Sequence, residues 1–400
     1  MSDPNIHRRG FLKAGTVGLF GLGAAWSRCR ASAAQEKSPD FDLDLEEEDA
    51  PSIQKYNALG NTGLKVSDIS MGMAREESVY RYALDRGINL FDTAESYYQG
   101  QHEKDIGRAF KKVRDKVVIM TKHFFGKPEA ITRQKVIKRF EDSLKRLDSD
   151  YVDIALWHEV ADPALFECEE LLRAYEELKK AGKYRFLGFS THKPDTICPV
   201  AFDTKRFSMM MVIYNSVQYP ERSPMIAKAG SLGLGVVTMK TMMGQEQDKL
   251  AELADDRNTY SQAAIKWALT DRNVSSVMIT MRTFEHIDEY LNASGQKLTP
   301  KDTEVLKKYV KAIDHRFCRI GCSTCLAACP HGVAIHDIMR FGMYFENYGE
   351  RKRAALDYSR MKEKYRASPC LACQGECAGA CPHDLEIQGR LIRYNSLLRS

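Results

Sequence analysis

Eight of the eleven cysteines of this chain lie between residues 318 and 381, in two sets of four. The sets are Cys318, Cys322, Cys325 and Cys329, followed by Cys370, Cys373, Cys377 and Cys381. Each set ends in Cys-Pro-His, and only the second cysteine differs in spacing between the two. Thiolate sulfur is a preferred ligand of zinc and of iron–sulfur clusters. The segment is therefore a two-fold repeat that predicts a pair of metal centres.

The spacing within the sets favours iron–sulfur clusters over zinc, because zinc sites usually separate two Cys-x2-Cys pairs by a longer loop. The run Cys-x2-Cys-x3-Cys-Pro resembles that of bacterial ferredoxins, whose fourth cysteine ligates the other cluster. The resemblance implies two [4Fe-4S] clusters with one cysteine exchanged between the sets. Their ligands would be Cys318, Cys322, Cys325 and Cys381 for the first cluster, and Cys370, Cys373, Cys377 and Cys329 for the second. Four disulfides or two structural zinc ions are the alternatives.

The segment between the two sets, residues 333–367, is rich in Arg, Lys, Tyr, Met and Ala. Ile335, Ile338, Met339 and Met343 follow near-helical spacing, which predicts one or two helices there. This arrangement resembles the all-helical type of two-cluster ferredoxin. We expect residues 298–400 to form a small, mainly helical domain, whose first helix is capped by Thr299 with Pro300 at its first position.

The preceding part of the chain, from residue 53 to residue 297, alternates short apolar runs with amphipathic stretches. Eight runs are candidate strands, at residues 69–71, 89–92, 117–121, 152–157, 186–190, 209–213, 236–239 and 277–280. The stretches between them carry helical patterns, such as the apolar series Val136, Phe140, Leu144 and Leu147. Eight strand–helix units over about 240 residues predict a (β/α)8 barrel, whose functional residues lie at the C-terminal ends of the strands.

Polar residues of specific types stand at those ends. Asp92 and Tyr97 follow the second candidate strand, Lys122 the third and His158 the fourth. Over nearly the whole predicted barrel the sequence resembles the aldo-keto reductases, in the segments LGNTGLKVS (59–67), GINLFDTA (87–94), YVD (151–153) and GFS (188–190). The resemblance maps the four catalytic residues of that family onto Asp92, Tyr97, Lys122 and His158, so we expect an oxidoreductase acting on a small carbonyl or alcohol.

The chemistry of carbonyl reduction explains these four residue types. A tyrosine with an ordinary pKa near 10 is a poor acid at neutral pH, so a nearby ammonium such as Lys122 must favour its phenolate. Asp92 would hold Lys122 by an ion pair, and His158 would orient the carbonyl oxygen. Singly, each residue could instead anchor a loop, fill the core or cap a strand. Their succession on three consecutive strands favours the shared catalytic role.

The same resemblance assigns nicotinamide contacts to Ser190, Thr191, Lys240, Arg282 and Glu289. The site departs from the family pattern, because Thr191 replaces an asparagine, the sixth strand lacks a glutamine, and Lys240 follows the seventh strand where an aromatic residue is usual. The Met-Lys ending of that strand resembles a ferredoxin-bearing branch of the family. We therefore expect NADP(H) as a possible cofactor in an altered site.

Residues 1–33 resemble a twin-arginine export signal, with Arg8-Arg9 before Phe-Leu-Lys, a weakly apolar run over 14–26 and Ala-Ser-Ala at 31–33. The apolar run is shorter than the roughly 20 residues that a membrane-spanning helix needs, so no stable anchor is expected. Seven acidic residues within 40–49 predict a disordered linker over 34–52. The signal implies contact with the twin-arginine export machinery and a periplasmic or otherwise exported protein.

The charge of the chain excludes some partners. Its formal net charge is +5, and the five basic residues and one acidic residue among the first 33 account for most of it. The remainder is nearly neutral, so neither nucleic acid nor a membrane surface is an expected partner. Three functions fit the pattern: an exported reductase whose clusters exchange electrons with a redox partner protein, a carbonyl reductase with structural clusters, or a non-enzymatic electron carrier on a barrel scaffold.

Overall fold

A computed structural model describes residues 50–216, 222–243, 259–313 and 316–399, which belong to one compact unit. The predicted export signal (1–33) and nearly all of the acidic linker (34–52) lie outside the described residues. No helix within the described ranges has both the length and the apolar character needed to cross a membrane.

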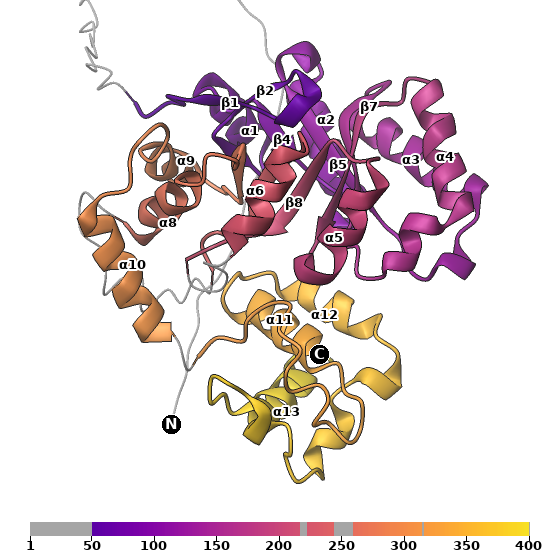
Figure 1. Cartoon of the computed structure of the whole chain (residues 1–400), viewed down its shortest axis with the longest axis vertical. Coiled ribbons are helices and arrows are strands. Elements are labelled where there is room, and N and C mark those ends of the chain that lie inside the picture. The colour runs from indigo at the N-terminus through magenta and orange to yellow at the C-terminus, as the bar shows by residue number, and fades with distance from the viewer. Residues whose placement is uncertain (1–49, 217–221, 244–258, 314–315, 400) are drawn as a thin grey trace, which may run out of the picture. The chain divides into compact units, whose positions relative to one another are not determined.

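Eight parallel strands form a closed barrel in the order β10-β3-β4-β5-β6-β7-β8-β9, with helices outside them (Figure 1). The strands are β3 (Ile69–Met71), β4 (Leu90–Asp92), β5 (Val118–Phe124), β6 (Val152–His158), β7 (Tyr184–Thr191), β8 (Met209–Ile213), β9 (Gly235–Met239) and β10 (Ser276–Ile279). All eight predicted strands are present, and the predicted (β/α)8 barrel is confirmed.

The helices of the barrel present one apolar face to the strands. They are α1 (Glu77–Asp85), α2 (Gln101–Phe110), α3 (Arg133–Leu147), α4 (Glu169–Lys180), α5 (Pro194–Thr204), α6 (Ser223–Ser231), α8 (Tyr260–Leu269) and α9 (Phe284–Leu291). The four apolar residues that predicted α3 are all buried, whereas most of its other side chains are not. Burial of this stripe against the strands is what fixes the helix on the barrel.

A second apolar cluster fills the inside of the barrel. It joins Leu90, Met120, Ile154, Leu156 and Met209 from the strands with Leu59, Leu64 and Val66 from an N-terminal hairpin. The hairpin strands are β1 (Tyr56–Ala58) and β2 (Lys65–Ser67). The Asn61 amide of the hairpin donates to Gly233 O, which precedes β9, so the hairpin closes the N-terminal end of the barrel. The interior is therefore packed, and the polar residues occupy its opposite end.

The strands differ from the prediction mainly at their ends. The third strand, β5, continues to Phe124, so Lys122 lies inside the strand and not at its end. Strands β5 and β6 stay paired as far as Phe124 and His158. This extension follows from pairing with a neighbour and cannot be read from the local sequence, because the added residues are Lys-His-Phe.

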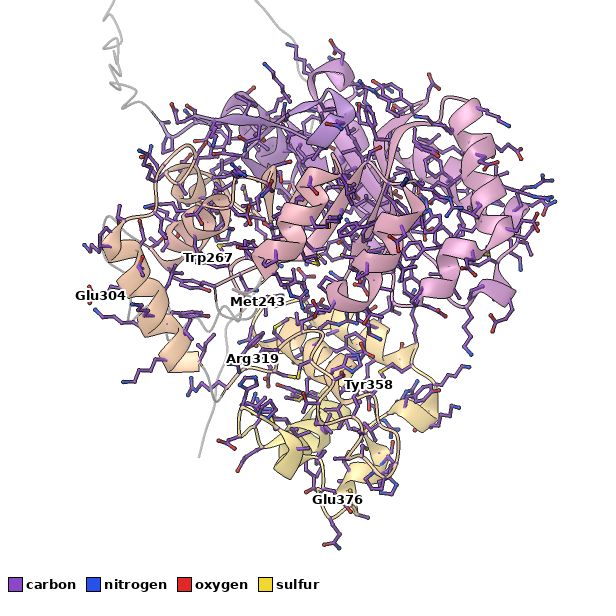
Figure 2. The ribbon with its side chains drawn as sticks, viewed as in Figure 1. Met243, Trp267, Glu304, Arg319, Tyr358 and Glu376 are labelled. Atoms are coloured by element: carbon purple, nitrogen blue, oxygen red, sulfur yellow. The ribbon has the colours of Figure 1, made fainter. Side chains whose placement is uncertain are left out.

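After the barrel, α10 (Pro300–Ile313) begins at the predicted proline, and the Thr299 hydroxyl accepts a hydrogen bond from the Asp302 amide at 3.1 Å. The C-terminal segment, residues 316–399, contains α11 (Ile335–Glu346), α12 (Arg351–Ser359) and α13 (Ile387–Leu397). The predicted helical character between the cysteine sets is confirmed, and the four apolar residues that predicted it are buried in or beside this core. Figure 2 shows Tyr358 inside the segment and Glu376 at its surface.

Glycine permits the close packing of α11 against α13. A Cβ atom on Gly342 would lie 2.3 Å from atoms of the Tyr394 ring, closer than two carbon atoms can approach. One buried apolar cluster runs from the outer face of the barrel strands into this segment, through residues such as Ile338 and Leu391. The C-terminal segment therefore shares a core with the barrel.

Candidate active site

Asp92 and Lys122 form a buried ion pair at the C-terminal end of the barrel. The Lys122 ammonium lies 2.5 Å from each carboxylate oxygen of Asp92 and donates a further hydrogen bond of 2.7 Å to Thr93 O. Burial lowers the pKa of Lys122 and raises that of Asp92, while the charge of each partner opposes the shift of the other. The pair fixes an ammonium between strands β4 and β5, as the sequence predicted.

Tyr97 begins the short 3-10 turn Tyr97–Gly100 after β4. The Lys122 ammonium lies 4.7 Å from the centroid of the Tyr97 ring. The guanidinium carbon of Arg353, a residue of the C-terminal segment, lies 5.1 Å from the same centroid. Burial first, and then the charge of Asp92, raise the pKa of Tyr97 well above its ordinary value, while Arg353 lowers it. The expected lowering by Lys122 does not prevail, because Asp92 neutralises that ammonium and burial disfavours the phenolate.

His158 is the last residue of β6 and is 7% exposed. Its ring meets the ring of Tyr97 edge-on, with centroids 5.8 Å apart. Burial lowers the pKa of His158 well below its ordinary value, so the imidazole is neutral at physiological pH. Its Nδ1 atom has no hydrogen-bond partner among the described residues. Because Nδ1 is itself buried, a hydrogen bond from this neutral imidazole to a substrate oxygen would come from Nε2, which lies 4.0 Å from the Glu159 carboxylate.

The four predicted catalytic side chains line one cavity of about 110 Å³. The remaining charged, polar and aromatic side chains around it are Glu159, Ser190, His192, Lys240, Thr280, Tyr344 and Arg353. The four predicted catalytic residues come from β4, the turn after it, β5 and β6, so the barrel brings together groups that are up to 66 residues apart in sequence. Two of the others, Tyr344 and Arg353, come from the C-terminal segment.

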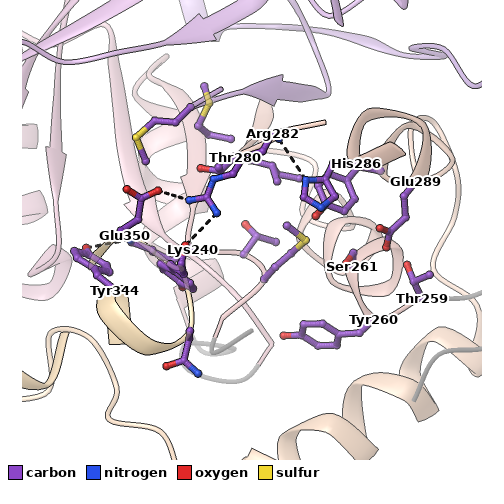
Figure 3. A pocket seen from close by; sticks show the side chains of 18 of the residues that line it. Lys240, Thr259, Tyr260, Ser261, Thr280, Arg282, His286, Glu289, Tyr344 and Glu350 are labelled. Atoms are coloured by element: carbon purple, nitrogen blue, oxygen red, sulfur yellow. Dashed lines mark hydrogen bonds and ion pairs between the residues drawn. The ribbon is translucent and has the colours of Figure 1, made fainter. Parts of the chain in front are cut away.

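A larger cavity of about 510 Å³ shares Lys240, Thr280, Tyr344 and Arg353 with the first (Figure 3). Three of the five residues predicted to contact the cofactor, Lys240, Arg282 and Glu289, line it.

Ser190 and Thr191, the other two predicted contacts, are differently placed. Ser190 lines the smaller cavity, and its hydroxyl accepts a 2.9 Å hydrogen bond from the Glu159 amide. The Thr191 hydroxyl donates to Val160 O at 2.7 Å and accepts from the Lys193 amide at 2.9 Å. Thr191 therefore stabilises its own loop, and Ser190 alone of the two borders a cavity that a ligand could enter.

Arg282 is already engaged by the C-terminal segment. It forms an ion pair with Glu350 and donates to Tyr348 O at 3.0 Å, as Figure 3 shows in part. The Glu350 side chain is 4% exposed and also accepts a 2.7 Å hydrogen bond from the Tyr98 hydroxyl. The Arg282 guanidinium, which was predicted to contact the cofactor, is thus already paired with the carboxylate of Glu350.

Comparison with known proteins agrees with this geometry. The sequence profile of the aldo/keto reductase family matches residues 58–311. The chain belongs to the aldo/keto reductase family. It is 24% identical over 342 residues to versiconal hemiacetal acetate reductase of Aspergillus parasiticus, covering 65% of this chain and 98% of that protein. It is 26% identical over 280 residues to L-galactose dehydrogenase of Arabidopsis thaliana, covering 60% and 88%. Membership and these relatives identify an oxidoreductase.

A solved aldo-keto reductase of Bacillus halodurans in its holo form has the same fold, with a TM-score of 0.54 and 23% identity over 64% of this chain and 96% of its own. The family match ends at residue 311, before the first of the eight clustered cysteines. The C-terminal segment therefore lies beyond the part of the chain that the family match covers.

Four residues of the C-terminal segment that no sequence pattern indicated lie at the mouth of this aldo/keto reductase, the end of the barrel where the strands terminate. They are Arg340, Tyr344, Glu350 and Arg353. The abundance of Arg and Tyr between the cysteine sets was visible, but not the direction of those side chains. Glu159 was also missed. It follows His158 with a φ of 50°, a conformation that is uncommon outside glycine, and its carboxylate lies 3.6 Å from Arg340. Such strain is typical of functional sites, yet leaves no local sequence signal.

The ten cysteines of the described ranges are all free thiols. Burial raises the pKa of Cys318 to about 12, and the thiols that add to this effect are Cys325, Cys322 and Cys381. Burial raises the pKa of Cys370 to about 11, and the thiols that add to it are Cys329, Cys377 and Cys373. Each of these two lists of thiols includes one cysteine of the other sequence set, and the pKa of Cys325 is raised by burial and then by Cys377 as well as by Cys322 and Cys381.

No set of three or more His, Cys, Asp or Glu side chains in the described part of the chain is arranged to hold a single metal ion. Two backbone amides donate to these sulfurs: that of Val333 to Cys329 and that of Gly375 to Cys373, both at 3.4 Å.

The buried ion pair between Asp92 and Lys122 is expected to affect the stability of the fold. Asp92→Asn leaves the Lys122 ammonium buried without a countercharge, so the free energy of unfolding should fall by about 3–5 kcal/mol. Adding Lys122→Met removes the second charge and should restore most of that loss. Urea denaturation of the single and double variants measures both values. A double variant as unstable as Asp92→Asn would show that the charge is not the cause.

Proposed function

We propose that this chain is an exported iron–sulfur aldo-keto reductase that interconverts a small carbonyl compound and its alcohol. The observation that carries the catalytic part is the convergence of Asp92, Tyr97, Lys122 and His158 on one cavity. Family membership supports the reaction class independently.

In the proposed reaction, the neutral imidazole of His158 hydrogen-bonds the carbonyl oxygen and holds it near the Tyr97 hydroxyl. When bound, NADPH would supply the hydride. Because its pKa is raised, Tyr97 keeps its proton at neutral pH and releases it only to the strongly basic alkoxide that develops on the substrate. The ammonium of Lys122 and the guanidinium of Arg353, 4.7 and 5.1 Å from the Tyr97 ring, stabilise the phenolate that remains.

Replacing the proposed proton donor tests this role. Tyr97→Phe removes the hydroxyl and keeps the ring, so kcat/KM for aldehydes with NADPH should fall about 10²–10⁴-fold. The matched control is Tyr82→Phe on α1, whose hydroxyl bonds Asp288 at 2.8 Å and lies outside both cavities. Its turnover should be unchanged. Full activity of Tyr97→Phe would refute the assignment.

NADP(H) is the nucleotide we propose for the larger cavity, where Lys240, Arg282 and Glu289 would hold it. Its volume of about 510 Å³ is in the range of cofactor sites. A phosphate that uses Arg282 must first displace Glu350, since the guanidinium is already paired. We infer that the nucleotide is bound more weakly than the site alone would allow.

Removing the charge of Glu350 tests this competition. Glu350→Gln should strengthen NADPH binding roughly 5- to 150-fold, the usual range of coupling between two sites. Glu346→Gln is the matched control, because Glu346 pairs with Arg393 away from both cavities. Quenching of intrinsic fluorescence by NADPH gives the dissociation constants. Equal affinity in wild type and Glu350→Gln would contradict the competition.

Two [4Fe-4S] clusters are the cofactors we propose for the C-terminal segment. The two sets of four cysteines, each ending in Cys-Pro-His, support this proposal, and the described cysteines form no disulfide. Cys318, Cys322, Cys325 and Cys381 would hold one cluster, and Cys370, Cys373, Cys377 and Cys329 the other. When bound, such clusters supply one-electron transfer, which suits exchange with a redox partner protein.

Exchanging single cysteines tests both the clusters and their pairing. Cys318→Ser and Cys381→Ser should remove the same signal from the low-temperature electron paramagnetic resonance spectrum of anaerobically reduced protein. Cys370→Ser and Cys329→Ser should remove the other, and the control Cys168→Ser neither. Loss of the same signal in Cys381→Ser and Cys370→Ser would refute the exchange between sets. Iron-free wild-type protein would refute the clusters themselves.

We propose that residues 1–33 direct the folded protein through the twin-arginine export machinery to the periplasm or beyond. The pair Arg8-Arg9 before Phe-Leu-Lys supports this. Changing both arginines to lysine should retain the full-length chain in the cytoplasmic fraction of the cell. The same change at Arg28 and Arg30 should leave export intact. Export of the first double variant would contradict the signal.

A further inference from the structure

Arg353 reaches from the C-terminal segment into both cavities of the barrel mouth. It lies in the first turn of α12 (Arg351–Ser359), and its side chain is 22% exposed. Its guanidinium carbon lies 5.1 Å from the ring centroid of Tyr97 and 5.0 Å from that of Tyr344. The guanidinium therefore stands beside the proposed proton donor, between a phenol of the barrel and a phenol of the C-terminal segment.

The hydrogen-bonding capacity of this guanidinium is largely unused. Arg353 makes no side-chain hydrogen bond with any described residue, and its ion-pair partner Asp357 lies 3.6 Å from Nε and lines neither cavity. The two other arginines at the mouth are satisfied differently: Arg282 is paired with Glu350, and Arg340 bonds Asp337 and His192. A guanidinium carries five N–H donors, and leaving them unfilled in a sheltered site is costly.

Lys240 adds a second cation where the two cavities meet. Its ammonium donates to the Tyr344 hydroxyl at 3.1 Å and forms no ion pair with any carboxylate in the described ranges. Its backbone φ of 58° is left-handed, and the Asn215 side chain donates to its carbonyl at 3.1 Å. A lysine held in this strained conformation is directed to one place, which is typical of a functional position.

The smaller cavity therefore carries an excess of positive charge. Its charged lining consists of Lys122, Lys240 and Arg353 against Asp92 and Glu159. Asp92 is paired with Lys122, and Glu159 faces Arg340 at 3.6 Å, so neither carboxylate forms an ion pair with Lys240 or Arg353; Asp357, the partner of Arg353, lies outside both cavities.

The pKa of the Tyr344 phenol is consistent with this excess of positive charge. Burial alone would raise its pKa, but Lys240, Arg340 and Arg353 together outweigh burial, and the pKa of Tyr344 lies below its ordinary value. A phenolate is favoured there only because the surroundings stabilise negative charge.

We propose that Arg353 and Lys240 form a subsite for a carboxylate of the substrate, so that the enzyme acts on short oxo acids and the corresponding hydroxy acids. This inference rests on the proposed carbonyl chemistry at Tyr97 and adds a substrate class to it. A guanidinium binds a carboxylate through two parallel N–H donors, a geometry that an ammonium cannot supply. The cavity of about 110 Å³ restricts the substrate to a short chain, and the closeness of Arg353 to Tyr97 keeps the carboxylate near the reacting carbonyl.

The C-terminal segment would then recognise the substrate as well as close the mouth. The carbonyl is held by groups of the barrel, His158 and Tyr97, and the anion by Arg353 of α12 with Lys240 of the barrel. Arg353 then has two roles: it binds the carboxylate of the substrate, and its charge stabilises the Tyr97 phenolate.

Charge selectivity of the wild-type enzyme is the first test. Pyruvate and 4-oxobutanoate are compared with their methyl esters, which keep the carbon chain and remove the charge. At least one acid should have a KM about tenfold or more below that of its ester. In Arg353→Gln this advantage should disappear, whereas kcat should fall by a similar factor for acid and ester, because both lose the same charge beside Tyr97; Arg353→Lys should restore part of the advantage, because the charge returns without the planar fork. Lys352→Gln, on an exposed neighbour in the same helix, should match wild type.

Direct binding separates this subsite from the catalytic proposal. Titration calorimetry with malonate needs no turnover: wild type should bind it at least tenfold more tightly than Arg353→Gln, and should bind the neutral malonamide weakly. If malonate binding depends on Arg353 while no carbonyl is reduced, the subsite stands and the catalytic function fails. If both esters are reduced as well as the acids and Arg353→Gln changes neither ratio, the subsite is refuted and the catalytic function stands.

Two further outcomes would overturn the substrate assignment. Weaker NADPH binding in Arg353→Gln, with an unchanged preference for acids over esters, would show that Arg353 holds a phosphate of the cofactor. Tighter binding of inorganic phosphate than of malonate to the wild-type protein would show that the anion is a phosphate and not a carboxylate.

Discussion

The polar closure of the barrel mouth by the C-terminal segment is the constraint on which the rest of this structure depends. Glu350 pairs with Arg282 and accepts from Tyr98, and Arg340 bonds His192 and lies 3.6 Å from Glu159. Each contact joins a side chain of the segment to a barrel residue near the end of a strand. Because these groups are largely buried, removing one partner leaves the other desolvated and unpaired, which costs more than the pair contributes. Both cavities exist in their present form because of this closure.

The closure also sets the electrostatics of the site. Two phenols face the same small cavity, yet the pKa of Tyr97 is raised and that of Tyr344 is lowered. Tyr344 is buried and Tyr97 is half-buried, and burial raises the pKa of both, so burial cannot explain the difference. Tyr97 lies close to the carboxylate of Asp92, whereas Tyr344 is surrounded by Lys240, Arg340 and Arg353. Three charged residues at the mouth therefore separate a phenol that retains its proton from one that releases it more readily.

Much of this could be predicted from the sequence, for physical reasons that particular residues illustrate. The barrel could be predicted because each strand is a short buried run and each helix repeats its apolar residues with helical spacing, as α3 does through Val136 and Phe140. The convergence of Asp92, Lys122 and His158 followed from parallel strands, whose C-terminal ends meet at one rim. These inferences need only local patterns and one topological rule.

What the sequence could not predict depends on contacts between distant parts of the chain. Arg353 is about 250 residues from Tyr97, and nothing near either residue indicates that they meet. The altered pKa of Tyr97 could not be predicted for a related reason. The effect of Lys122 was anticipated, but its neutralisation by Asp92 and the strength of burial depend on how completely the mouth is closed.

One thermodynamic consequence follows from the double use of Arg282. The same guanidinium anchors the C-terminal segment through Glu350 and is the group best placed to receive a phosphate in the larger cavity. If a ligand must displace Glu350 in order to bind, docking of the segment weakens that ligand by some factor, and the ligand weakens docking by the same factor. Couplings of this kind are typically about 1–3 kcal/mol. Since Arg353 and Tyr344 belong to the same segment, any loosening of it would also reshape the smaller cavity. The two cavities are therefore coupled through the segment that lines both. A ligand in one cavity should change the affinity of the other cavity for its own ligand, without any direct contact between the two ligands.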